Sequence, residues 1–170
     1  NFNRRIRLWL LLLWVLVPCA NTMATQQQRI AVIPFSIHAE KKYEYLQQGT
    51  TDILSFGVSE QGQVELVDPA RIAASLETVD QPLNDATAKN LGRQLQADIV
   101  VFGSVSIFGS TVSMQGKALE VTENGQVIRL SRQLTSIDEI IPETKAFASD
   151  INNRLIRPVV SDAQKPKEDS

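Results

Sequence analysis

The amino-acid sequence predicts an α/β (α+β) domain, in which helices pack on a mixed β-sheet of about five strands. Two segments carry this prediction, residues 29–35 (Arg-Ile-Ala-Val-Ile-Pro-Phe) and residues 99–102 (Ile-Val-Val-Phe). Both are apolar at successive positions, so both faces of each strand are expected to be buried, as in sheets with helices on either side. The residues between the two segments show helical periodicity, which supplies the covering helices.

Residues 1–24 are expected to be a secretory signal that is absent from the mature protein. A basic start precedes an apolar run at residues 8–18, which is shorter than the roughly 20 residues of a membrane-spanning helix. Small residues at Thr22 and Ala24 place the cut after Ala24. The full chain has a formal net charge of −2, and loss of the basic leader makes it more acidic. This charge disfavours nucleic acid as a partner, because phosphate binding requires a cationic surface.

Cys19 is the only cysteine of the chain, so an intrachain disulfide is excluded. Its place at the end of the apolar run also fits a bacterial lipid-attachment site, which would anchor the protein to a membrane. Pro18 stands where lipoprotein signals usually carry Ala, Gly or Ser, and this favours an ordinary cysteine within the signal. An acylated amino-terminal cysteine in the mature protein would distinguish the lipid anchor.

Residues 29–35 are expected to form the first strand, which Pro34 ends and a polar loop through Lys42 follows. A helix is expected next, because apolar and small residues recur there with a period of 3.6 residues. The members of this stripe are Leu46, Thr50, Ile53, Leu54, Gly57 and Val58, with Gly62 closing the helix. Residues 64–67 (Val-Glu-Leu-Val) read as a short second strand.

Capping residues mark the starts of two further helices. Asp68 followed by Pro69 combines a side-chain cap with a proline at the first helical position. Asn84 or Asp85 caps the next helix. The apolar stripes are Ile72, Leu76 and Val79 in the first helix, and Ala88, Leu91, Gly92 and Leu95 in the second.

A β-meander is expected after these helices. The third strand, residues 99–107, begins apolar on both faces and then alternates, so it should run from beneath the helices into a half-exposed hairpin that turns at Gly109-Ser110. In the fourth strand the apolar parity changes near Gly116, which predicts a β-bulge. Asn124-Gly125 is a strong hairpin signal, and it leads to the last strand, residues 127–134.

A final helix is expected after the meander. Ser136 and Glu139 have the spacing of a capping box, but Pro142 would interrupt the second turn of a helix that began there. A short turn followed by a main helix over residues 142–155 is therefore expected. Its buried stripe consists of Phe147, Ala148, Ile151 and Leu155.

No residue pattern points to catalysis, to a metal site or to a cofactor, so we expect no enzyme activity. His38 is the only histidine, which together with Cys19 is too few ligands for a zinc site. The glycines match neither the dinucleotide-binding nor the P-loop pattern, and Gly103-Ser104-Val105 lacks the second glycine of a nucleophile elbow. Asp52 and Glu60 lie about two turns apart on one helix, too far for an acid–base pair, and are expected to be solvated.

The strand at residues 127–134 is a candidate for the edge of the sheet, where a partner's strand can be accepted through backbone hydrogen bonds. Arg129 and Arg132 lie on this strand. They are candidates for contact with a partner, but protective charges are the favoured interpretation, because charged edges are how sheets avoid pairing.

The order of these motifs resembles the TolB-like N-terminal domain of exported bacterial proteins. The resemblance covers about residues 29–132. The matching segments are Ile30-Ala-Val-x-Pro-Phe35, Leu46-Gln-Gln-Gly-Thr-Thr-Asp-Ile-Leu54, Val64-Glu-Leu-Val-Asp-Pro-Ala-Arg71, Leu91-Gly-Arg-Gln-Leu-Gln-Ala-Asp-Ile-Val-Val-Phe-Gly-Ser104 and the hairpins around Gly109, Val112 and Gly125. Residues 138–142 and 147–152 are similar to the leading segment of envelope proteins that continue into FG-GAP or VCBS repeats, although no such repeats occur in this sequence.

This resemblance implies a TolB N-terminal-domain-like fold over residues 25–156, in a protein of the periplasm or outer membrane of a Gram-negative bacterium. It implies a non-catalytic interaction or assembly module with protein partners in the envelope, in some relatives with a covalently following β-propeller. It assigns no catalytic, cofactor-binding or metal-binding residue. The polar composition of residues 157–170 predicts a tail or linker.

Two alternatives stay open. One is a lipid-anchored component of an envelope or secretion assembly, held to the membrane through Cys19. The other is a small-ligand-binding domain, which would require a deep polar pocket with converging groups.

Overall fold

The computed structural model describes residues 27–60, 64–79 and 82–156. The elements are β1 (Gln28–Val32), β2 (Ser36–His38), α2 (Tyr45–Ser59), β3 (Val64–Leu66), α3 (Pro69–Leu76), α4 (Asp85–Leu95), β4 (Ile99–Phe108), β5 (Thr111–Glu120), β6 (Val127–Leu134) and α5 (Ile140–Arg154), with 3-10 turns at Lys41–Tyr43 and Ile137–Glu139. The predicted signal at residues 1–24, including Cys19, and the predicted tail at residues 157–170 lie outside the described residues, so both stay predictions.

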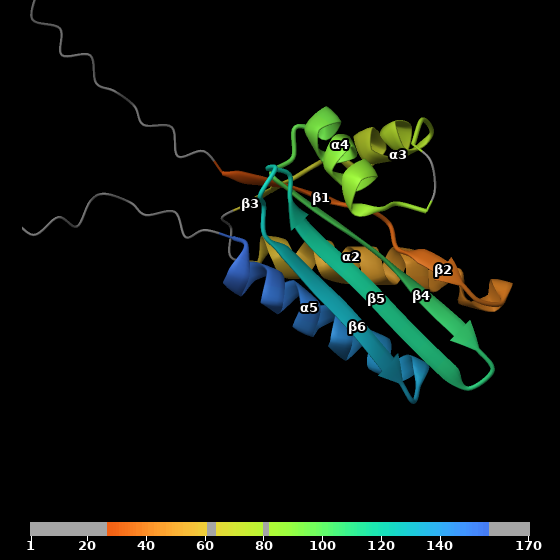
Figure 1. Ribbon diagram of the computed structural model, residues 1–170. Helices are drawn as coiled ribbons and strands as arrows, with labels where there is room; N and C mark the ends of the chain where they lie inside the picture. The colour runs from red at the N-terminus through yellow and green to blue at the C-terminus, as the bar shows by residue number, and fades with distance from the viewer. Residues whose placement is uncertain (1–26, 61–63, 80–81, 157–170) are drawn as a thin grey trace, which may run out of the picture.

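The strands form one mixed sheet in the order β3-β1-β4-β5-β6, with β2 also paired to β4. β1 lies parallel to β3 and to β4, whereas β4, β5 and β6 form an antiparallel meander (Figure 1). The predicted fold class, a mixed sheet with helices packed on it and a meander followed by a helix, is confirmed. The prediction of a loop from Pro34 through Lys42 is wrong in one respect. Within this segment, β2 pairs in parallel with β4, beginning with Ser36 opposite Ser104.

Helices cover the sheet on both faces, and each face has its own apolar core. α2 and α5 lie side by side on one face, and α3 and α4 lie on the other (Figure 1). In β4, Ile99 and Val101 belong to the core beneath α2 and α5, whereas Val100 and Phe102 belong to the core beneath α3 and α4. All four side chains are buried. The prediction that residues 99–102 are covered on both faces is therefore confirmed.

The β-bulge predicted near Gly116 does not form. β5 keeps one register against β4 along its whole length, with Gly116 opposite Gly103, and one register against β6, with Gly116 opposite Leu130. The change of apolar parity has another cause. Ala118 faces the core under α2 and α5, whereas Leu119 faces the core under α3 and α4, so this end of β5 is buried on both sides.

The two predicted hairpins form with different turns. Gly109 adopts a φ of 62° between the paired residues Phe108 and Thr111, a backbone conformation that glycine adopts without steric cost. The second connection is longer, since the last pair in its ladder is Leu119 with Val127. Gly109 is the only glycine with positive φ in the described ranges. The hairpin predicted at Asn124-Gly125 is confirmed.

Side-chain caps mark the starts of α3 and α4, whereas α2 and α5 begin without one. The Asn84 side chain accepts hydrogen bonds from the backbone N–H groups of Ala86 and Thr87, and the backbone N–H of Asn84 donates to the hydroxyl oxygen of Thr87. α5 begins at Ile140, two residues before the expected start at Pro142. Proline is tolerated there, because the N–H groups of a first helical turn have no partner within the helix.

An ion pair ties α4 to the sheet and makes a small part of the stability depend on pH. The Lys117 ammonium lies 2.5 Å from Asp85 Oδ1, and the guanidinium of Arg129 lies 3.6 Å from Asp85 Oδ2. The hydrogen bond from Lys117, more than the charge of Arg129, lowers the pKa of the Asp85 carboxyl. Since the pKa is lower in the folded state, the stabilisation is complete above the unfolded value of about 4 and is lost as the pH falls through the folded value.

We therefore expect the variant Asp85→Asn to lose part of the acid sensitivity of unfolding. At pH 7 the variant should be less stable by at most about 1 kcal/mol, because the pair is partly exposed. The difference between the two proteins should shrink as the pH falls below 4. Urea unfolding at a series of pH values checks this, and a difference that stays constant from pH 7 to pH 2 would contradict it.

Candidate functional site

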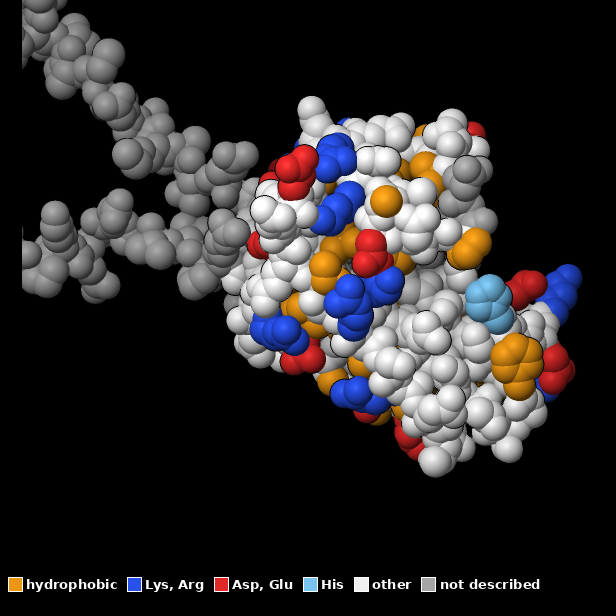
Figure 2. Space-filling model, in the orientation of Figure 1, with side chains coloured by type: hydrophobic (Ala, Val, Ile, Leu, Met, Phe, Trp, Pro, Cys, Tyr) orange, Lys and Arg blue, Asp and Glu red, His pale blue; other side chains and the backbone are white. Residues whose placement is uncertain are grey.

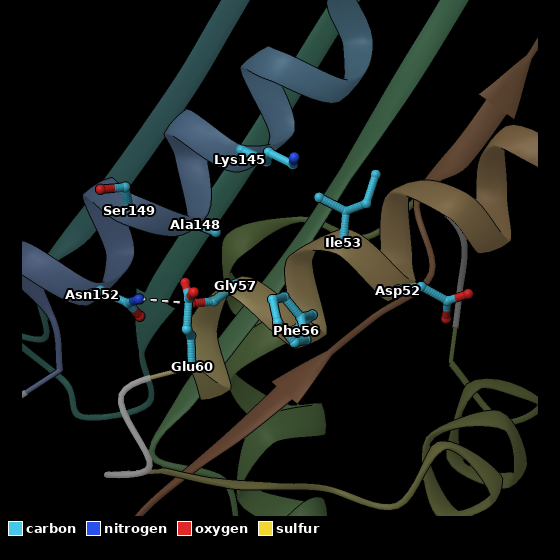
Figure 3. Close-up of a pocket in the computed structure, with 9 residues that line it drawn as sticks. All are labelled: Asp52, Ile53, Phe56, Gly57, Glu60, Lys145, Ala148, Ser149 and Asn152. Carbon is cyan, nitrogen blue, oxygen red and sulfur yellow. Dashed lines mark hydrogen bonds between the residues drawn. The ribbon is translucent and has the colours of Figure 1, made fainter.

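A hollow of about 540 Å³ lies between α2 and α5, on the side of these helices that faces away from the sheet. We call it the groove. Its lining consists of Asp52, Ile53, Phe56 and Gly57 from α2, Glu60 directly after α2, and Lys145, Ala148, Ser149 and Asn152 from α5. Figure 3 shows the residues of the two helices along its two sides.

Small residues and one hydrogen bond hold the floor of the groove together. A Cβ atom added to Gly57 would lie only 2.7 Å from the Cβ of Ala148, so the two helix backbones approach closely there. The side-chain amide of Asn152 donates a hydrogen bond of 2.7 Å to the carbonyl oxygen of Gly57 (Figure 3). Gly57 lies in the last turn of α2, where the carbonyl oxygens accept no hydrogen bond from within the helix. The bond therefore satisfies a group at a helix end and fixes the spacing of α2 and α5.

The groove presents apolar surface to solvent. Phe56 is 69% exposed although it is one of the largest apolar side chains, and Ile53 beside it is half-buried. Ile141, which is 50% exposed, precedes Lys145 by one helical turn and so extends the same side of α5. Exposed apolar side chains that gather on one surface are typical of interaction sites in soluble proteins.

Charged side chains border this apolar surface. Three charged residues line the groove, and all are exposed: Asp52 in α2, Glu60 at the end of α2, and Lys145 in α5. Among the described residues, no hydrogen bond links the carboxylates of Asp52 and Glu60, which lie about two helical turns apart. An apolar centre with a charged rim has the composition of a protein-contact surface.

The structure does not assemble these residues into a reaction centre. His38, predicted in a loop, is an exposed residue of β2. Over residues 27–60, 64–79 and 82–156, no group of three or more His, Cys, Asp or Glu side chains is placed to hold a metal ion. Thr50 and Thr144 are buried, but Thr144 donates its hydroxyl proton to the carbonyl of Ile140, one turn earlier in α5. The groove offers apolar side chains, charged side chains and the polar side chains of Ser149 and Asn152.

The arginines singled out in the sequence lie elsewhere, on β6. Arg129 is the more loosely held, with its guanidinium 3.6 Å from Asp85, whereas Nε of Arg132 lies 3.3 Å from a carboxylate oxygen of Glu143. Both side chains remain more than half exposed, at 62% and 55%. Their proposed contact role concerns the sheet edge and is separate from the groove.

Sequence reasoning missed the groove. The apolar stripe of α2 is buried at Leu46, Thr50, Leu54 and Val58. Phe56 falls outside this stripe, which was the available signal, because a phenylalanine on the solvent side of an amphipathic helix has no place in the core of its own domain. The closeness of α5 at this point depends on tertiary packing, which the periodicity of either helix does not specify.

Within the described residues, none of the helices combines the length and the apolar character needed to cross a membrane.

Comparison with known proteins gives similarities of fold. No family model matches the chain, and no curated protein sequence matches it. Among solved structures, the LpoB C-terminal domain from Salmonella enterica is 14% identical with a TM-score of 0.48, covering 68% of this chain and 87% of that chain. Lipoprotein GNA1162 from Neisseria meningitidis is 17% identical with a TM-score of 0.46, covering 75% and 98%. TolB from Acinetobacter baumannii is 14% identical with a TM-score of 0.49, covering 75% of this chain and 28% of that chain. At these values, the comparisons transfer no function to this chain.

Proposed function

We propose that this chain is an exported, non-catalytic interaction module of the bacterial envelope, and that it binds a partner protein through the groove between α2 and α5. The observation that carries the proposal is Phe56, an aromatic side chain that is 69% exposed and lines a hollow between two packed helices. Aromatic residues in such positions contribute strongly to protein–protein binding.

The construction of the groove supports a preformed site. Gly57, Ala148 and Asn152 join the two helices directly, through close packing and the 2.7 Å hydrogen bond. A rigid wall reduces the conformational entropy that a partner must overcome on binding. Among the polar side chains of the lining, Asn152 alone is buried, and its Oδ1 has no hydrogen-bond partner among the described residues. The other polar side chains of the lining are exposed, whereas the alternative of a small-ligand site requires several polar groups that converge in a deep pocket.

Export and envelope location belong to the proposal and come from the sequence. The basic and apolar leader at residues 1–24 and the motif order over residues 29–132 both favour an exported bacterial protein. The alternative of a lipid-anchored component differs only in the fate of Cys19, and it leaves the role of the groove unchanged.

Site-specific photo-crosslinking in the producing bacterium tests the proposal. A photoreactive residue in place of Phe56 is expected to crosslink the full chain to one envelope protein. The matched control is Phe108, which is 72% exposed but lies at the tip of the β4–β5 hairpin, outside the groove. Crosslinks of the same protein at both positions, or at position 108 alone, would contradict the proposal.

A further inference from the structure

The outer edge of β6 is a second surface with a defined chemistry, which we call the β6 edge. β6 ends the order of strands in the sheet, and within the described residues its ladder partner is β5. Figure 1 shows it as the outermost strand of the meander. The inference drawn from it goes beyond the proposed function, because it does not involve the groove.

The register shows which backbone groups of β6 face outward. The backbone N–H of Glu120 donates to the carbonyl of Gln126, so residues 120 and 126 form a hydrogen-bonded pair. In an antiparallel ladder such pairs recur at every second residue, and the register therefore directs the even-numbered residues of β6 toward β5. The N–H and C=O groups of the odd-numbered residues point away from the sheet. They belong to Val127, Arg129, Ser131 and Gln133.

One contact bears this assignment out. The guanidinium of Arg132 donates a hydrogen bond of 3.1 Å to the carbonyl oxygen of its neighbour Ser131. A side chain reaches this oxygen because it faces the outside of the sheet. The other outward groups form a row of donors and acceptors of the kind that an added strand would pair with.

The two faces of β6 differ in polarity, and this difference specifies the added strand. Ile128, Leu130 and Leu134 are buried against the core under α2 and α5. Arg129, Ser131 and Gln133 are exposed and project from the opposite face. Figure 2, in the orientation of Figure 1, shows blue Lys and Arg side chains on this face, interspersed with red Asp and Glu side chains and with the white of other side chains and of the backbone.

A second copy of this chain fits the β6 edge poorly. Two β6 strands paired about a two-fold axis would bring Arg129 of both copies to one face of a short junction and Arg132 of both copies to the other face. Like charges across a strand pair are destabilising. An acidic strand avoids this repulsion and offers a carboxylate to Arg129, whose present contact with Asp85 is a loose 3.6 Å.

We propose that the β6 edge binds an extended segment of a partner protein as an additional antiparallel strand, with acidic side chains on the face of Arg129 and apolar side chains on the face of Leu130. In this arrangement the acidic residues lie directly opposite the odd-numbered residues of β6. Their own N–H groups therefore point at β6, whereas those of the apolar residues point away.

This geometry gives a sharp test with a synthetic peptide of alternating valine and glutamate, capped at both ends. Added to the isotope-labelled full chain, it should shift the backbone amide NMR signals of Val127, Arg129, Ser131 and Gln133. N-methylation of its glutamates removes the N–H groups that face β6 and should weaken binding about tenfold or more. N-methylation of its valines is the matched control and should change the affinity less than about threefold.

Variants of the protein give a second readout. Ser131→Pro removes an outward N–H without removing a bond to β5, a position where edge strands tolerate proline, and it should weaken binding as glutamate methylation does. Ser131→Ala, which keeps the backbone N–H, should not weaken binding. Arg129→Glu, which keeps the backbone unchanged, should also weaken binding and should favour a lysine–valine peptide instead.

Several results would overturn the proposal. They are the absence of shifts on β6, equal effects of the two methylated peptides, shifts confined to the groove, and unchanged binding by Arg129→Glu. Shifts of the β6 signals that grow with protein concentration in the absence of peptide would identify a second copy as the occupant, and would also overturn it.

Discussion

Replacing Gly103 with alanine is expected to lower the free energy of unfolding by about 3 kcal/mol, at the upper end of the usual cost of overpacking. A Cβ atom at this position would lie 2.2 Å from the backbone oxygen of Gln115 and 2.5 Å from the ring of Phe35. Gln115 belongs to the strand paired with β4, so the obstacle is sheet backbone and not the flexible end of a side chain. The β4–β5 pairing would have to shift to make room.

The control for this variant is Gly49→Ala in α2, where an added Cβ atom meets nothing within 4 Å. Alanine is favoured over glycine in a helix, so this change should raise stability by about 0.5 to 1 kcal/mol. Urea unfolding of both variants measures the difference. Equal stability of Gly103→Ala and the unchanged protein would show that the packing at this point of the sheet is not as described.

Truncating Phe147 to alanine is expected to cost about 3 to 5 kcal/mol, the range for a large aromatic side chain in a core. Phe147 is 1% exposed, and it packs α5 against the sheet. Its ring occupies the space above Gly116, since a Cβ atom there would lie 2.8 Å from the ring edge. Ile141→Ala on the same helix is the control and should cost much less, because that side chain is 50% exposed.

The pairing of Phe147 with Gly116 predicts non-additive effects. Gly116→Ala alone should be destabilising because the ring obstructs the new methyl group. In a Phe147→Ala background the methyl group enters vacated space, so the double variant should be more stable than the sum of the single losses implies. Thermal or urea unfolding of the four proteins checks this. Strict additivity would mean that the ring does not lie against Gly116.

The sequence specified the parts of the fold that depend on local patterns. The double-sided apolar run at 99–102 predicted a covered strand. The cap at Asp68, and a cap at Asn84 or Asp85, predicted two helix starts, and the structure has them with Asp68 and Asn84 as the caps. β2 was not predictable in the same way. It is a short segment whose pairing to β4 depends on backbone contact with residues far away in the chain.

Two further differences have a common physical origin. The parity change at Leu119 suggested a bulge, but it arises because the helices of both layers reach this end of β5. Likewise, the exposed position of Phe56 on α2 forms part of a groove only because α5 packs beside α2. Patterns along one element show which positions are apolar, but the partner of each apolar position is set by the packing of the other elements.

The most direct test of the central claim, that the groove is a site of protein contact, is the affinity of the full chain for the envelope protein that crosslinks at position 56. Isothermal titration calorimetry should compare the unchanged protein with Phe56→Asp and Phe108→Asp, two substitutions of similarly exposed side chains. We expect Phe56→Asp to weaken binding at least about thirtyfold, as loss of an interface hot spot does, and Phe108→Asp to bind like the unchanged protein. Unchanged affinity of Phe56→Asp, or equal losses in the two variants, would contradict the account.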